Sequence, residues 1–90
     1  MAVFAVSYDL RAPGRNYQPL YDVLEGSGIR ALESFWFVEA NMSASEVTDI
    51  LLKSLDQNDG LFVSTIEPGP TWAAYKLLPG ATDWLKARRP

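Results

Sequence analysis

The sequence predicts a single α+β domain over residues 1–90, with the element order strand, helix, strand, strand, helix, strand and a short extra strand at the C-terminus. Three observations predict it. An apolar β-type run opens the chain, two amphipathic segments carry helix start signals, and two further stretches are rich in β-branched and aromatic residues. At this length a domain buries only about 60% of the surface its unfolded chain exposes. The 48% hydrophobic content therefore suggests a core with some apolar surface left over for a partner.

The first strand is predicted at Val3 to Tyr8, an apolar run without a charged residue. Such a run is typical of a strand buried on both faces, which favours a central place in the sheet. Asp9 follows it as a lone carboxylate. The turn-rich stretch 12–16, with its proline and glycine, separates this strand from the next element.

The first helix is predicted from Tyr17 onward, because apolar residues then recur at the i, i+3, i+4, i+7 spacing of one helical face. Asn16 is the expected N-cap. The run Gly26-Ser27-Gly28 is expected to stop the helix with a glycine in the left-handed conformation.

Two short strands are predicted between Ile29 and Ala40, with a break near Glu33-Ser34 that favours a hairpin. In the second of them, Phe35 and Phe37 point one way while Trp36 and Val38 point the other. Apolar groups on both faces suggest that the protein's own helices cover one face and a second subunit covers the other.

The second half predicts a helix at Ala44 to Leu55 and a strand at Leu61 to Ile66. Ser43 and Glu46 have the spacing of a capping box, and the buried stripe is expected to be Val47, Ile50, Leu51 and Leu55. A further short strand is predicted at 71–77 and a helical turn at 83–87. The whole order matches the ferredoxin-like split βαβ arrangement, with two helices on one face of an antiparallel sheet.

Composition excludes several kinds of active site. Without histidine or cysteine, the chain has no Ser-His-Asp or Cys-His nucleophile and no thiolate or imidazole zinc site, so any metal would be a hard cation held by oxygen ligands. The net charge of −3 disfavours non-specific binding to nucleic acid. No run resembles a signal peptide or approaches the roughly 20 apolar residues of a membrane span, so a cytoplasmic protein without membrane contact is expected.

Several short motifs resemble the small CRISPR adaptation nuclease family and its SinR-like and VapD-like relatives. The first strand closes in Tyr8-Asp9-Leu10, and a serine followed by apolar residues lies at the junction of the second and third strands, as in members of that superfamily. The SinR-like branch is similar in three motifs, which lie here at Leu32 to Trp36, Ser43 to Glu46 and Asp83 to Leu85.

The resemblance implies a homodimer of ferredoxin-like subunits in which the final strand packs against the partner's sheet. In nuclease members, the aspartate that ends the first strand comes from each subunit, and the pair holds a divalent cation near the dimer axis. Asp9 is the one residue here that matches this ligand. The resemblance therefore implies that Asp9 would bind Mg²⁺ and would be the catalytic residue. Ser34 matches the junction serine, whose hydroxyl could touch a phosphate or bond the backbone.

Each candidate site residue also has a structural explanation. For Asp9 the favoured explanation is a turn residue that accepts backbone amides. Arg11 and Arg15 could clamp a phosphate, or could be solvated or paired with Glu33 and Glu39. The aromatic rings could stack on bases, but the sequence lacks the ribonucleoprotein signature, which favours core or interface positions for them.

The sequence therefore favours a small homodimeric binding or interaction protein without catalysis and without a cofactor. The alternative is a Mg²⁺-dependent endonuclease that acts on RNA or DNA through paired Asp9 residues. A weaker third reading is a regulator that binds single-stranded RNA on its sheet, and the partner could be a nucleic acid or a protein.

Overall fold

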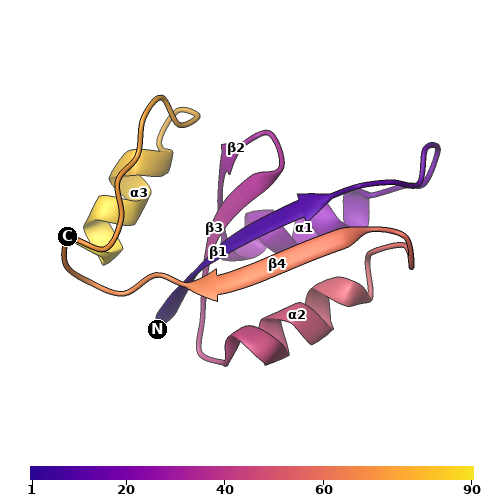
Figure 1. Ribbon diagram of the computed structural model, residues 1–90, viewed down its shortest axis with the longest axis horizontal. Coiled ribbons are helices and arrows are strands. Elements are labelled where there is room, and N and C mark those ends of the chain that lie inside the picture. The colour runs from indigo at the N-terminus through magenta and orange to yellow at the C-terminus, as the bar shows by residue number, and fades with distance from the viewer.

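The computed structural model describes residues 1–90, which form an open four-stranded antiparallel sheet and three helices (Figure 1). In chain order the elements are β1 (Ala2–Asp9), α1 (Gln18–Ser27), β2 (Gly28–Leu32), β3 (Phe35–Ala40), α2 (Ala44–Leu52), β4 (Gly60–Thr65) and α3 (Ala81–Arg88). The strands lie in the order β2-β3-β1-β4, so β1 has a central place as predicted. This small α+β arrangement is compatible with a ferredoxin-like fold, although the chain has one strand fewer than expected and ends in a third helix.

The larger core lies between the sheet and the helices α1 and α2. The residues buried there come from β1, β3, both helices and the turn after α2: Phe4, Val6, Tyr8, Leu20, Leu24, Trp36, Val38, Val47, Leu51 and Leu55. The prediction that these two helices share one face is confirmed. Helix α2 ends at Leu52 rather than Leu55, and Ile50, expected in the buried stripe, is exposed.

The second face of the sheet is covered in part by the chain's own C-terminal region. Val3, Ala31 and Phe37 of the sheet pack there against Ala81 and Leu85 of α3, in a separate buried cluster. In Figure 1, α3 lies at one end of the sheet, beside β2. A second subunit is thus not needed to cover this part of the face.

The predicted strand at 71–77 is wrong, because the segment between β4 and α3 contains no strand. Within the predicted strand, Lys76 has a positive φ of 52°, which lies outside the β region. The segment is held by side chains instead. Trp72 packs on the second cluster, and its Nε1 donates to the carbonyl of Arg89 at 3.0 Å.

The predicted helical turn at 83–87 is confirmed and is part of the longer helix α3. The two arginines at the C-terminus are bound to the rest of the chain. Arg88 Nε donates to Glu39 at 2.9 Å, and the Arg89 guanidinium donates to the carbonyls of Ile66 and Met1 at 2.7 and 3.0 Å. These contacts tie the last residues to β3 and to the N-terminus.

Of the two predicted helix starts, the one at α2 is confirmed and the N-cap of α1 is wrong by one residue. Ser43 and Glu46 form the complete capping box at the start of α2. At α1, Asn16 Oδ1 accepts from the backbone N of Gln18 at 3.0 Å, but the N-cap position itself is held by Tyr17, one residue later than predicted. None of the three helices is both long and apolar enough to cross a membrane.

Gly28 links α1 directly to β2, and its conformation differs from the expected one. Its φ of −172° is extended rather than left-handed. Glycine is required here for a different reason: a Cβ atom would overlap the carbonyl oxygen of Phe37 and lie 2.7 Å from the carbonyl carbon of that residue. The position therefore needs glycine because two backbones approach closely.

Candidate functional site

Asp9 lies at the end of β1 with its side chain 71% exposed. Its carboxylate accepts a hydrogen bond from Arg11 Nε at 2.9 Å, in an exposed ion pair. The chain contains no cluster of three or more side chains that could hold a metal ion. Asp9 is therefore not part of a site made of three His, Cys, Asp or Glu side chains from one chain.

Arg11 and Arg15 both reach the loop between α2 and β4. The backbone N of Arg11 donates to Asp59 Oδ1 at 2.7 Å, and its Nη1 donates to the carbonyl of Asn58 at 3.1 Å. Arg15 Nη2 donates to the carbonyl of Leu55 at 3.2 Å. The structure thus gives these arginines partners in the neighbouring loop.

The pairing with Glu33 and Glu39 that the sequence suggested does not form. Glu39 pairs with Arg88, and Glu33 takes part in no ion pair. Arg15 lies instead 3.8 Å from Asp56. In this arrangement the arginines join the loop after β1 to the loop before β4.

Asp59 is the centre of this junction, and sequence reasoning missed it. Its carboxylate accepts hydrogen bonds from Arg11 N, from Asp56 N at 2.8 Å, and from the Tyr17 hydroxyl at 2.8 and 2.9 Å. Desolvation alone would raise the pKa of Asp59, but the hydrogen bonds from Arg11, Asp56 and Tyr17, with the charge of Arg15, together lower it. Because the folded-state pKa is lowered, the ionised carboxylate stabilises the fold at neutral pH, and this contribution is lost as the pH falls through the folded pKa.

Ser34 lies in the turn between β2 and β3, where its carbonyl accepts from the backbone N of Tyr8 at 3.1 Å. This contact fixes the turn beside the end of β1. An open cavity of about 350 Å³ results, lined by Tyr8, Asp9, Leu10, Tyr21, Arg30, Glu33 and Ser34. The structure therefore brings Asp9 and Ser34 to one cavity, while Arg11 and Arg15 do not line it.

Arg30 lines this cavity and is, after Asp59, the second residue that sequence reasoning missed. Its guanidinium lies between the rings of Tyr21 and Trp36, 5.0 and 5.1 Å from their centroids. Its Nη2 donates to the Tyr8 hydroxyl at 3.2 Å. Arg30 lies opposite the buried Trp36 in the strand register, so the two side chains share a face of the sheet, and no pattern along the sequence indicates this.

The aromatic residues of the site have mainly structural positions. Tyr8 and Trp36 are buried, and Trp36 Nε1 donates to the Tyr8 hydroxyl at 3.0 Å inside the core. Tyr17 is engaged with Asp59. The interpretation of these rings as core rather than as platforms for bases agrees with their contacts.

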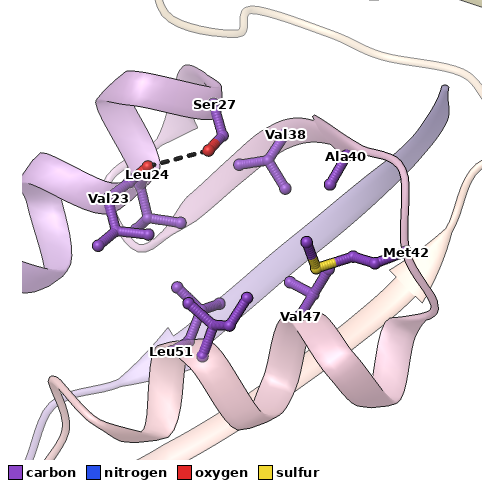
Figure 2. Close-up of a pocket in the computed structure, with 9 residues that line it drawn as sticks. Val23, Leu24, Ser27, Val38, Ala40, Met42, Val47 and Leu51 are labelled. Atoms are coloured by element: carbon purple, nitrogen blue, oxygen red, sulfur yellow. Dashed lines mark hydrogen bonds between the residues drawn. The ribbon is translucent and has the colours of Figure 1, made fainter.

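A separate apolar cavity opens between α1, α2 and the end of β3 (Figure 2). Figure 2 shows Val23 and Leu24 of α1 on one side and Val47 and Leu51 of α2 on the other, with Met42 beside Val47. Its volume of about 60 Å³ is far below the ~300 Å³ at which ordinary ligand pockets begin. It is therefore a small gap between two helices.

Comparison with known proteins finds no family model and no solved structure that matches this chain. The three SinR-like motifs all have local structural roles. Leu32 to Trp36 forms the hairpin turn, Ser43 to Glu46 caps α2, and Asp83 to Leu85 carries the buried leucine of α3. The family resemblance remains an expectation from these short motifs.

Proposed function

We propose that this protein is a small non-catalytic binding protein of ferredoxin-like architecture that acts as a homodimer. The observation that carries the proposal is an uncovered apolar strip on the second face of the sheet, next to an unprotected edge strand.

The strip crosses all four strands in one row and is apolar except for Ser7 of β1; a β-bulge lies just before Leu32 in β2. The strand register places Phe62 opposite Ser7, Ser7 opposite Phe35, and Phe35 opposite Leu32, so the four side chains share one face. Phe62, at 67% exposure, and Leu32 are exposed. An aromatic ring this exposed on a sheet face is typical of a surface that a partner covers.

An apolar cavity continues the strip toward the C-terminal region. It has a volume of about 420 Å³, and all of its lining residues are hydrophobic, among them Ala5, Phe35, Trp72 and Tyr75. Tyr75, at 81% exposure, stands at this surface. The C-terminal region thus covers one end of the second face and leaves an apolar surface beside it.

The edge of the sheet at β4 favours a second copy of the chain as the partner. β4 pairs with β1 on one side only, and Gly60–Thr65 contains no charged residue and no proline. Native edge strands usually carry such residues, because an unprotected edge pairs with another strand. Two β4 edges related by a twofold axis would form a continuous sheet and bring the two Phe62 side chains to one interface.

The contacts of the charged residues support a role without catalysis. Asp9 is paired with Arg11, and both Arg11 and Arg15 are bound to the neighbouring loop. The groups that a phosphoryl-transfer reaction would need as ligand and clamp are thereby engaged in holding the fold.

Replacing Phe62 with lysine tests the dimer. The charge would be desolvated at the interface, so Phe62→Lys is expected to be a folded monomer at concentrations where the wild type is a dimer. The measurement is molar mass by light scattering, with folding checked by circular dichroism. Leu52→Lys on α2 is the control, because Leu52 is exposed away from the sheet and its variant should remain dimeric. A dimeric Phe62→Lys would contradict the proposed interface.

A Mg²⁺-dependent endonuclease is the second candidate, favoured by the exposed position of Asp9 at the end of β1. Two facing Asp9 carboxylates could hold a cation that stabilises charge on a phosphoryl group. This function predicts Mg²⁺-dependent cleavage of labelled single-stranded RNA or duplex DNA that stops with chelator and in Asp9→Ala. We expect no cleavage in any sample. Cleavage by the wild type that Asp9→Ala abolishes would replace the binding function with the enzymatic one.

A further inference from the structure

We propose that the polar cavity beside the end of β1 binds a small zwitterion of the amino-acid type, with its carboxylate on Arg30 and Tyr8 and its ammonium group toward Glu33. All of these residues belong to one subunit, so the site does not depend on the dimer.

Arg30 is a half-buried cation without a counter-charge. The three ion pairs of the chain involve Arg11, Arg15 and Arg88, and none involves Arg30. Of its donors, Nη2 reaches the Tyr8 hydroxyl, while Nε is buried without any hydrogen-bond partner. Nε has no surface that a ligand could reach, so the donor available to a ligand is Nη1, which is not buried and makes no hydrogen bond within the chain.

The Tyr8 hydroxyl adds a second unused donor. Tyr8 is only 6% exposed, yet it lines the cavity. Its oxygen accepts from Trp36 Nε1 and from Arg30 Nη2, and its own proton has no acceptor in the structure. Because the hydroxyl oxygen already accepts two hydrogen bonds, the hydroxyl can interact with a ligand only as a donor. Tyr8 and Arg30 both line this cavity, so the Tyr8 hydroxyl and Arg30 Nη1 are the donors that an oxyanion there would use.

The shape of the guanidinium favours a carboxylate. Its planar fork matches two carboxylate oxygens, and the rings of Tyr21 and Trp36 hold it in one orientation. Preorganisation of this kind lowers the entropic cost of binding. Ser34, exposed at the rim, offers a further hydroxyl donor.

The cavity is also lined by two carboxylates, those of Asp9 and Glu33, and their charge determines which ligand groups can bind beside Arg30. Asp9 is neutralised by Arg11, but Glu33 has no ion-pair partner. A phosphate dianion would meet this negative charge, whereas a ligand with a single carboxylate and a nearby ammonium group would complement both Arg30 and Glu33. The volume of about 350 Å³ falls within the range of small-molecule sites.

The test compares L-alanine with propionate, which lacks only the ammonium group, and with inorganic phosphate. Each is titrated into ¹⁵N-labelled protein while the Arg30 Nε–H and Trp36 Nε1–H resonances are followed by NMR. We expect saturable shifts of both resonances with alanine, at an affinity in the millimolar range or better, and weaker binding of propionate and phosphate.

Three variants assign the contacts. Arg30→Lys keeps the charge but loses the fork and should weaken alanine binding about tenfold or more. Glu33→Gln, on the exposed turn, should leave propionate binding intact and remove the preference for alanine. Lys53→Gln, exposed beyond the end of α2, is the control and should bind as the wild type does. Absence of saturable shifts with alanine would overturn the site, as would phosphate binding more tightly than alanine. Equal binding of propionate and alanine, or an unchanged preference in Glu33→Gln, would overturn the zwitterion assignment.

Discussion

Gly28→Ala is expected to cost the domain about 3 kcal/mol or more of its free energy of unfolding, which is a large share of the stability of a small protein. The added Cβ would overlap the carbonyl oxygen of Phe37, and the carbonyl carbon of Phe37 lies only 2.7 Å away. Both neighbours are backbone atoms of β3, so no rotamer change relieves the overlap. The strand β2 would have to move away from β3.

Urea unfolding followed by circular dichroism measures this effect. Gly26→Ala is the matched control, because the residue lies in α1 and the added Cβ would meet nothing within 4 Å beyond its chain neighbours and the backbone of its own helix. Alanine is favoured over glycine in a helix by about 1 kcal/mol, so this variant should be as stable as the wild type or more so. Equal unfolding midpoints for the two variants would contradict the close approach of β2 and β3.

Leu85→Ala is expected to destabilise the protein by about 2–5 kcal/mol, the range found for truncation of buried leucines. Leu85 is 1% exposed and packs with Val3, Ala31 and Phe37 of the sheet. The variant therefore tests whether α3 belongs to the cooperative fold. Its control is Leu78→Ala, which truncates an exposed leucine of the same region and should change the stability little.

Thermal or urea unfolding of the two variants distinguishes a docked α3 from a loose one. A docked helix predicts a single cooperative transition that shifts in Leu85→Ala. An unchanged midpoint would contradict the packing of α3 on the second face.

Local signals in the sequence predicted the elements that local physics determines. The capping box of Ser43 and Glu46 positions the start of α2, and the turn at Glu33-Ser34 positions the hairpin, because each depends on residues a few positions apart. The segment between β4 and α3 could not be predicted in this way. Its β-type residues, such as Trp72, fold against the second cluster through side chains, which is a tertiary effect.

Local signals also predicted part of the candidate site, and the part that depends on tertiary contacts was missed. Asp9 and Ser34 follow from strand ends, and the structure brings them to one cavity. The hydrogen bond between Tyr17 and Asp59 joins residues 42 positions apart, and the stacking of Arg30 on Trp36 requires the register of two strands. Neither leaves a pattern that can be read along the chain. Asp59 therefore looked like an ordinary turn residue.

The molar mass of the wild-type protein in solution tests the proposed homodimer most directly. Light scattering at micromolar concentration is the measurement. Pairing of two β4 edges and their Phe62 side chains predicts twice the 10.0 kDa mass of the chain. A mass equal to one chain over the same range would contradict the homodimer.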